Sequence, residues 1–359
     1  MSVDESSVRL NLLRFPLIVG VVFIHAYRTN VEFSGGSIII NQGTSLAGDF
    51  LRNLVSQGLA QVAVPLFFLM SGYLFFRNCS WSTSGYLEKI RSRMHTLLVP
   101  FLFWNIATVI LVAMAQALPA TATYFSGKNT SIASYNGLDY LSAIFGIGRM
   151  PISYQFWFIR DLMLLALATP AIFVAAEFAP RLLLGALFAT WITGFWPIYA
   201  PSSEATLFFS LGCVLSIQNL DLFRMDAHGK IITIFYCIMA LADAAFTQTL
   251  TGAYIHKIAI MLGIATALYL TSTALKAEPL KRILLNLGAT SFFIYAAHEP
   301  VLTIVKKIIY KIIQPDSSHS VLALYFAIPV FVIVLLLGTN RVLRAYFPEF
   351  SRVINGGRH

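Results

Sequence analysis

The stretch from Leu97 to Leu118, LLVPFLFWNIATVILVAMAQAL, contains no charged residue over 22 positions. A run of about 20 apolar residues is long enough to cross the hydrocarbon core of a bilayer as a helix. Similar runs recur along the whole chain, and they decide the fold class. We therefore predict an all-α polytopic membrane protein.

The other apolar runs give a bundle of about ten transmembrane helices. No internal repeat or linker interrupts the pattern, so we predict a single domain over residues 1–359. The span at 205–217 is short for a crossing and is expected to be tilted, broken or buried among its neighbours. The predicted spans are residues 10–27, 59–76, 97–118, 155–176, 182–199, 205–217, 231–250, 253–274, 287–305 and 321–342.

The composition supports the membrane assignment and excludes other classes. Hydrophobic residues make up 57% of the chain and charged residues 11%, against roughly 25% charged in a soluble domain. This balance excludes a disordered chain, a coiled coil and a Lys/Arg-rich nucleic-acid-binding domain. The three cysteines lack metal-ligand spacing, so no metal site is expected.

Positive charge in the connections predicts the orientation. If the N-terminus is cytoplasmic, 15 of the 25 Lys and Arg residues lie on inner segments and 8 on outer segments. Both termini are therefore predicted to be cytoplasmic. Two long outer connections, Arg28–Gly58 and Pro119–Tyr154, are candidates for substrate recognition; they contain Asp49, Tyr124, Tyr140 and Tyr154, among which the sequence gives no choice.

Two polar residues interrupt the first span. Arg14 and His25 are 11 residues apart, so they share one helix face and are separated by roughly 16 Å along the axis. Each alone is compatible with a snorkelling side chain at the membrane interface. Together on one face, they indicate a polar interior.

The second and third spans carry two further motifs. Ser71-Gly72 is compatible either with close helix packing or with space for a narrow substrate arm. The connection that follows holds Lys89, Arg91 and Arg93. These cations are suited to anchoring the chain at anionic lipid, or to binding the phosphates of a nucleotide-containing molecule.

Polar groups also occur in the fourth and ninth spans. Trp157 and Arg160 share a helix face while Asp161 points elsewhere, and an interfacial aromatic belt explains part of this pattern. His298 and Glu299 fall near mid-depth, where a carboxylate facing lipid would be costly. Pro300 should free a backbone carbonyl one turn earlier in the same helix.

Five sequence blocks, in their order along the chain, resemble the motifs of the acyltransferase-3 family of integral membrane acyltransferases. The resemblance extends from about Arg9 to Arg344. The blocks are Arg14-x10-His25, Pro65-Leu-Phe-Phe-Leu-Met-Ser71-Gly72-Tyr73, the basic stretch before Pro100-Phe101, Trp157-Phe-Ile-Arg160-Asp161 and Ser291-Phe-Phe-Ile-Tyr295-Ala-Ala-His298-Glu299-Pro300.

The resemblance implies an enzyme of the bacterial inner membrane that O-acylates a saccharide. The acyl donor would be acyl-CoA, usually acetyl-CoA, and the acceptor a cell-surface glycan or a lipid-linked saccharide. Membrane lipids and a glycan-synthesis complex are the implied partners, without nucleic acid. The implied roles are catalytic for His25, Arg14, Glu299, Arg160 and Asp161, donor-binding for Lys89, Arg91, Arg93, Ser71 and Arg77, and substrate-binding for Trp157, His298 and Tyr295.

Acyl transfer from a thioester to a hydroxyl needs a base and a group that stabilises the oxyanion. On this hypothesis His25 is the general base, oriented by Glu299 or Asp161, and an acyl-histidine intermediate is the alternative. Two rival functions remain at the level of sequence. One is a transporter or flippase of glycan precursors, and the other is a structural subunit of a glycan-synthesis complex.

Overall fold

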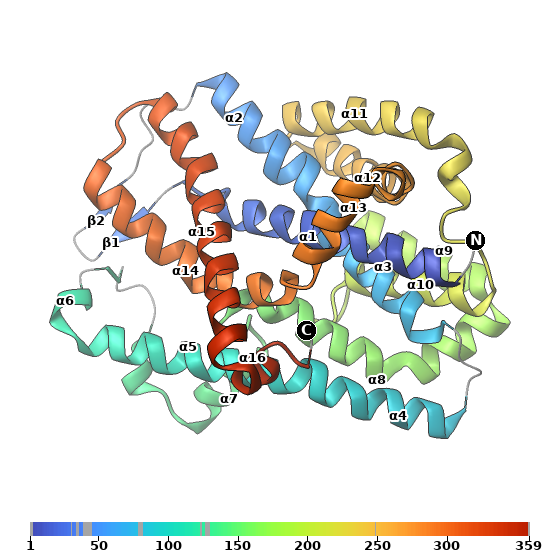
Figure 1. Cartoon of the computed structure of the whole chain (residues 1–359), viewed down its shortest axis with the longest axis horizontal. Helices are drawn as coiled ribbons and strands as arrows, with labels where there is room; N and C mark the ends of the chain where they lie inside the picture. The colour runs from blue at the N-terminus through green and yellow to red at the C-terminus, as the bar shows by residue number, and fades with distance from the viewer. Residues whose placement is uncertain are drawn as a thin grey trace.

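The computed structural model describes residues 3–29, 31–33, 36–38, 45–77, 82–122, 124–125, 130–247 and 249–357. Most of these residues are helical, as the apolar runs predict, and α1 crosses the middle of the molecule (Figure 1). The helices are α1 (Val3–Ala26), α2 (Leu46–Asn53), α3 (Ala63–Phe76), α4 (Thr83–Arg93), α5 (Val99–Ala117), α6 (Pro119–Ala122), α7 (Gly137–Phe145), α8 (Trp157–Phe178), α9 (Pro180–Thr193), α10 (Ser203–Ile217), α11 (Gly229–Ala245), α12 (Leu250–Lys276), α13 (Glu278–Gly288), α14 (Ser291–Ile313), α15 (Ser318–Tyr346) and α16 (Pro348–Ile354).

Short π- and 3₁₀-helical segments join some of these helices into longer rods. A π-helical segment at Leu54–Leu59 and a 3₁₀ turn at Ala60–Val62 connect α2 to α3, so the helical segment runs from Leu46 to Phe76. A π-helical segment at Met94–Leu98 joins α4 to α5 in the same way, over Thr83–Ala117. Much of the predicted outer connection Arg28–Gly58 is therefore helical from Leu46 onward.

A small hairpin follows the first long helix. Strands β1 (Val31–Phe33) and β2 (Gly36–Ile38) pair antiparallel, with Val31 opposite Ile38. The two outer connections also contain residues 39–44 and 126–129, which lie outside the described residues.

Seven helical segments within the described part of the chain are long and apolar enough to cross a membrane. They match the predicted spans at 10–27, 59–76, 97–118, 155–176, 231–250, 253–274 and 321–342. The other three predicted spans correspond to α9, α10 and the region around α13 and α14. The chain is thus an integral membrane protein in its architecture, and the total of about ten spans stays a prediction.

The three remaining spans differ from simple crossings for identifiable reasons. Helix α9 ends at Thr193, before the predicted end at 199. The next residue, Gly194, adopts a positive φ of 74° and ends the helix. The short helix α10 is largely buried, in agreement with one of the alternatives stated for it. The predicted span 287–305 joins two separate elements, because α13 ends at Gly288 and α14 begins at Ser291.

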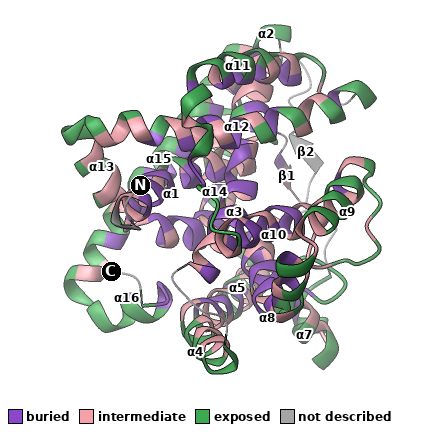
Figure 2. Cartoon of the chain, turned by 90° about the vertical axis from the view of Figure 1, so that its right-hand side faces the viewer, coloured by how far each residue is buried: buried purple, intermediate pink, exposed green. Residues whose placement is uncertain are grey.

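The core lies where α1, α3, α10 and α14 pack together (Figure 2). Helices α3 and α10 cross with their backbones in contact. A Cβ atom added at Gly72 would lie 2.0 Å from the Phe209 carbonyl oxygen, and one at Gly212 would lie 2.1 Å from that of Leu69. Small residues are what allow such an approach between membrane helices.

Helix α14 is broken beside the core at Pro300. Glu299 has non-helical dihedrals (φ −108°, ψ 134°), and proline has no N–H to donate to the carbonyl of Ala296 four residues earlier. The Gln155 side chain takes over this role, since its Nε2 donates to the carbonyl oxygens of Ala296 (3.1 Å) and Glu299 (3.0 Å). The carbonyl that the sequence predicted to be freed is thus bound by a residue of the 3₁₀ turn Tyr154–Phe156, directly before α8.

Candidate active site

A cavity of about 260 Å³ lies between α1, α3, the α4–α5 rod, α8 and α14. Residues distant in sequence meet on its walls, and several had been predicted to form the site. Those residues are Arg14, His25, Ser71, Arg93, Trp157 and Tyr295. The structure therefore assembles one cavity from all five of the sequence blocks.

Arg14 and His25 both line this cavity, as their spacing on one helix face predicts. Arg14 is exposed, so its end of the cavity is open, whereas His25 is half-buried. The closest backbone approach at the Arg14 end is at Gly288, where an added Cβ atom would lie 3.2 Å from the Asn11 carbonyl oxygen. The cavity thus runs along α1 from an accessible cation to a more enclosed imidazole.

The basic residues of α4 do not all reach the cavity. Arg93 lines it, and neither Arg93 nor Arg14 forms a hydrogen bond or ion pair with another described residue. The Lys89 ammonium donates to the Phe75 carbonyl oxygen and lies over the Phe75 ring. Arg91 is exposed and does not line this cavity. Two unpaired guanidiniums at one cavity can bind an anion.

Arg77 and Ser71 occupy different positions on α3. The Arg77 guanidinium lies 5.5 Å from the Tyr73 ring centroid and donates to Ser7 at 3.5 Å. Ser71 faces the cavity, while its neighbour Gly72 packs against α10. Each of the two residues therefore corresponds to one of the predicted alternatives. Gly72 allows close helix packing, and Ser71 borders open space.

The nearest aromatic neighbours of His25 come from two other elements. Its ring centroid lies 4.9 Å from that of Tyr154 and 5.0 Å from that of His298. No carboxylate lies within ion-pair distance of the His25 ring in the part of the chain that the structure describes. Neither of the two carboxylates proposed to orient His25, Glu299 and Asp161, contacts its ring directly.

His298 is fully buried, and its ring is fixed by its own helix. Its Nδ1 lies 2.7 Å from the Tyr295 carbonyl oxygen and 3.2 Å from that of Ile294. Because carbonyl oxygens only accept hydrogen bonds, Nδ1 carries the proton in these bonds. In the neutral ring, Nε2 is then an acceptor, and it has no hydrogen-bond partner.

Glu299 reaches His25 only through an intermediate residue. Its carboxylate accepts hydrogen bonds from the Tyr154 hydroxyl (3.0 Å) and the Thr303 hydroxyl (2.8 Å). Tyr154 in turn packs edge-on against His25. Glu299 therefore holds the ring that borders the imidazole.

Gln155 and Ser291 are cavity residues to which the sequence prediction gave no role. Besides binding the broken segment of α14, Gln155 accepts through its backbone carbonyl from the Tyr295 hydroxyl (2.8 Å). The Gln155 Oε1 and Ser291 Oγ atoms are buried without partners, and both residues line the cavity. A signal for Gln155 was present in Pro300, since a freed carbonyl needs a donor from elsewhere.

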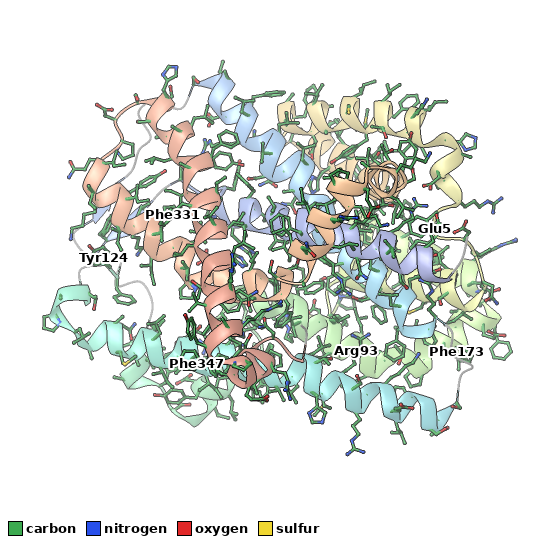
Figure 3. The ribbon with its side chains drawn as sticks, viewed as in Figure 1. Glu5, Arg93, Tyr124, Phe173, Phe331 and Phe347 are labelled. Atoms are coloured by element: carbon green, nitrogen blue, oxygen red, sulfur yellow. The ribbon has the colours of Figure 1, made fainter. Side chains whose placement is uncertain are left out.

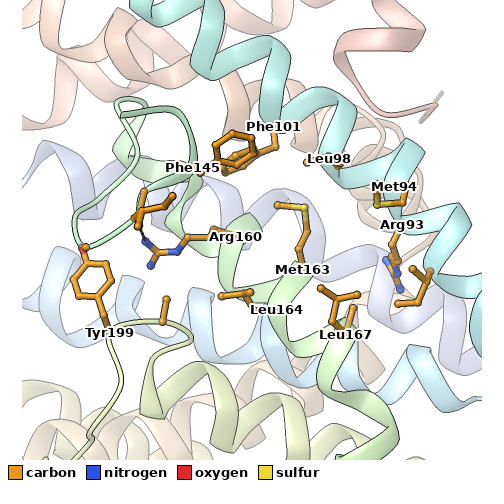
Figure 4. Close-up of a pocket in the computed structure, with 16 residues that line it drawn as sticks. Arg93, Met94, Leu98, Phe101, Phe145, Arg160, Met163, Leu164, Leu167 and Tyr199 are labelled. Atoms are coloured by element: carbon orange, nitrogen blue, oxygen red, sulfur yellow. Dashed lines mark hydrogen bonds between the residues drawn. The ribbon is translucent and has the colours of Figure 1, made fainter. Parts of the chain in front are cut away.

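Arg160 lines a second cavity, of about 520 Å³, shown in Figure 4, and Asp161 is its buried ion-pair partner. Arg160 and Tyr199 are at one end of it and Arg93 is at the other, with Met163, Leu164 and Leu167 between them. Arg93 lines both cavities, so the two meet at its side chain.

The Arg160 guanidinium is almost fully engaged. Its Nε and Nη2 donate to Asp161 Oδ1 at 3.1 and 3.0 Å, and its Nη1 donates to the carbonyls of Gly146 (2.9 Å) and Arg149 (3.3 Å). The other Asp161 oxygen accepts from the backbone N–H of Ser202 at 2.8 Å. This pair ties two connections to α8, and it does not line the His25 cavity.

Comparisons with known proteins agree with this architecture. The family model described as "Acyltransferase domain" matches residues 7–339. The chain is 27% identical over 365 residues to the succinoglycan biosynthesis protein ExoH of Rhizobium meliloti (strain 1021), with 98% of this chain and 92% of ExoH covered. No solved structure matches it significantly.

The match covers all five motif blocks and the cavity that they form. It favours the enzyme over the two rival functions, the transporter and the structural subunit. The chain belongs to the acyltransferase-3 family and is a membrane acyltransferase.

Proposed function

We propose that this enzyme moves an acyl group, usually acetyl, from acyl-CoA to a hydroxyl of a saccharide, either a cell-surface glycan or a lipid-linked precursor. The observation that carries the proposal is the His25 cavity, which is lined by the guanidiniums of Arg14 and Arg93, neither hydrogen-bonded nor ion-paired to a described residue, and by an imidazole farther along α1. The printed role of ExoH in succinoglycan biosynthesis supports a saccharide acceptor.

The proposed setting is a bacterial inner membrane with both termini in the cytoplasm. The chain then crosses about ten times, with α9, α10 and the α13–α14 region as crossings in addition to the seven long segments. In this orientation Arg14 lies toward the cytoplasm and His25 toward the opposite face. Any glycan-synthesis complex would meet the same outer face.

The donor enters from the cytoplasmic end in this proposal. Coenzyme A carries several phosphate charges that cannot cross the bilayer, and Arg14 and Arg93 supply matching cations. The thin pantetheine arm then passes Ser71 toward His25. Three of the predicted donor-binding residues lie outside the cavity: Lys89, Arg77 and Arg91. In this proposal they either contact the nucleotide at the cavity entrance or anchor the chain to lipid headgroups.

His25 acts as the general base at the far end. It accepts the proton of the acceptor hydroxyl while the hydroxyl oxygen bonds to the thioester carbonyl carbon. The C–S bond then breaks, and the proton passes from His25 to the leaving thiolate. Ser71, Ser291 and the Trp157 indole N–H line the cavity and supply donors for the oxyanion.

His298 is the proposed partner of the protonated His25. Its Nε2 is the buried acceptor without a partner, and its ring lies 5.0 Å from the His25 ring. A small rotation of His25 would let its second ring N–H donate to this atom. Glu299 supports the same arrangement indirectly, by holding Tyr154 against His25.

A sidedness experiment tests the proposal. The purified protein is sealed into vesicles with host glycan on one face, and radiolabelled acetyl-CoA is supplied only to the face that bears Arg14 and Arg93. Label should appear in glycan on the opposite face, and it should require acetyl-CoA rather than free acetate. Label that stays on the donor face would contradict the orientation, and absence of any acetyl-CoA-dependent label would contradict the function.

A further inference from the structure

A group of basic side chains surrounds the His25 end of the molecule. It consists of Arg28, just after α1, and of Lys306, Lys307 and Lys311 on α14, and we refer to these four residues as the outer basic cluster. In the proposed orientation all four face away from the cytoplasm. The positive-inside tendency of membrane proteins disfavours cations there, so their presence needs a reason.

The cluster is ordered by contacts with carbonyls and aromatic rings. The Lys306 ammonium donates to the Arg28 carbonyl oxygen at 2.8 Å, which ties the end of α1 to α14. Lys307 donates to the Tyr124 carbonyl oxygen at 2.5 Å, and Lys311 lies 4.5 Å from the Tyr124 ring centroid. Tyr124 lies at the opposite end of the molecule from Glu5 and Phe173 (Figure 3).

The charges of the cluster are incompletely balanced. None of its four residues forms an ion pair with a carboxylate within the described ranges of the chain. Two carboxylates are near enough for their charges to interact with it, Glu299 with Lys306 and Glu32 with Lys307. The cluster has four cations and only these two neighbouring carboxylates, so its surface carries a net positive charge.

This surface adjoins the residues that border His25. Arg28 follows His25 by three positions, and Lys306 follows Glu299 by seven, or about two helical turns. Arg28 interacts electrostatically with Tyr154, and Lys306 with both Glu299 and Arg28. A ligand bound between Arg28 and Lys306 would therefore lie near the Tyr154–Glu299 contact.

Anchoring to lipid headgroups is the other use of cations at helix ends. Anchoring side chains extend away from the protein toward the lipid. Here Lys307 and Lys311 instead point at Tyr124, in the connection that follows α6, and Lys306 points at the end of α1. These contacts hold the cations between the end of α1, helix α14 and the connection that follows α6. This arrangement favours binding of a ligand over the His25 cavity.

We propose that the outer basic cluster binds an anionic group, a carboxylate or phosphate, carried by the acceptor glycan. Arg28 and Lys306 contact the anion, and this contact places a nearby hydroxyl of the glycan at His25. The inference rests on the proposed function, and it adds that the acceptor glycan is anionic. Arginine with a neighbouring lysine is a common combination for recognising such oxygens.

Competition between charged and neutral oligosaccharides tests the inference. Acetyl-CoA-dependent labelling of host glycan is measured in vesicles containing the full chain, in the presence of oligoglucuronate or a neutral gluco-oligosaccharide of equal length. Oligoglucuronate should inhibit the wild type at roughly tenfold lower concentration, as expected for about one charged hydrogen bond. In the double variant Arg28→Gln/Lys306→Gln this preference should disappear, and the apparent KM for host glycan should rise while kcat stays within about twofold.

Two controls separate the explanations. Lys281→Gln/Arg282→Gln removes two cations from α13, far from the cluster in sequence, and should preserve the preference. The assay is repeated with and without phosphatidylglycerol in the vesicles. Equal inhibition by both oligosaccharides, or an effect of the double variant that depends only on the anionic lipid, would overturn the inference and leave the function intact. Absence of label from the wild type would overturn both.

Discussion

The His25 cavity and the Arg160–Asp161 cavity both contain charged or titratable side chains within apolar helices, but they differ in how their polar atoms are satisfied. Around Arg160, donors and acceptors meet in matched pairs, from Asp161 to Ser202 and the carbonyls of Gly146 and Arg149. Around His25, one polar atom of each of three residues is buried without a partner: His298 Nε2, Gln155 Oε1 and Ser291 Oγ.

The difference indicates separate functions for the two regions. Burying a polar group without a partner is costly, and a ligand bound in the cavity can supply the missing partner of a polar atom that borders it. The polar atoms around Arg160 are already paired and need no ligand. Their hydrogen bonds hold two neighbouring connections against α8. We therefore propose that the chemistry takes place at His25 and that Arg160 has a structural role, although the motifs alone suggested chemistry at both.

Breaking the Arg160–Asp161 pair should produce the largest loss of stability. Asp161→Ala leaves a buried guanidinium without its counter-ion, and removing one partner of such a pair costs about 3–5 kcal/mol. We expect a much lower melting temperature in detergent and a lower yield. The acyl-transfer rate per folded molecule should change little. Normal stability with lost activity would place Asp161 in the catalytic machinery instead.

The adjacent residues Gly72 and Ser71 offer a matched comparison within one helix. Gly72→Ala inserts a methyl group against the Phe209 carbonyl, so α3 and α10 must separate, and overpacking of this kind costs about 1–3 kcal/mol. Ser71→Ala changes only a cavity wall, and it should leave the free energy of unfolding within about 0.5 kcal/mol of wild type. Denaturation of both variants measures the contrast, and equal destabilisation would contradict it.

Substitution of His298 should reduce kcat more than it changes KM. Loss of a hydrogen bond to a charged group costs about 1.5–3 kcal/mol, which corresponds to roughly 10- to 150-fold in rate. We compare His298→Asn, whose amide replaces only the bond made by Nδ1, with His298→Gln, which presents a group near the position of Nε2. Partial rescue by glutamine alone supports the pairing with His25, and equal loss in both variants would argue for a packing role.

The contact between Tyr154 and Glu299 should have the smallest effect. Tyr154→Phe retains the ring against His25 but removes the hydroxyl that donates to Glu299. The lost hydrogen bond does not itself touch His25, so we expect only about 1 kcal/mol of its effect to reach the reaction, a loss of roughly fivefold in kcat. Steady-state kinetics with acetyl-CoA can resolve it. A loss as large as that of His298→Asn would mean that Tyr154, rather than His298, supports the base.

The sequence predicted the helical class, seven of the spans and the shared face of Arg14 and His25, because these follow from local apolar length and helical period. It left burial of α10 as one of three alternatives and did not predict that Met94–Leu98 joins α4 to α5, since both depend on neighbouring helices. The apolar run alone gave no sign that Pro300 divides the last part of the predicted span 287–305.

The candidate site was predicted in part for the same reason. Motif positions identified Arg14, His25, Ser71, Arg93, Trp157 and Tyr295, all of which line one cavity. The neighbour of His25 depends on where the start of α8 meets the broken α14, and spacing along the chain does not contain that information. Tyr154 therefore could not be chosen from the four candidates in the outer connections, and Gln155 received no role.

The most direct test of the account is the acyl-transfer rate of His25→Ala in vesicles, with the exposed His319→Ala as a matched histidine control. Loss of a general base should lower the rate by about 10²- to 10⁴-fold, with the melting temperature unchanged and the control at wild-type turnover. A folded His25→Ala variant with near-wild-type turnover would contradict the placement of the chemistry in this cavity.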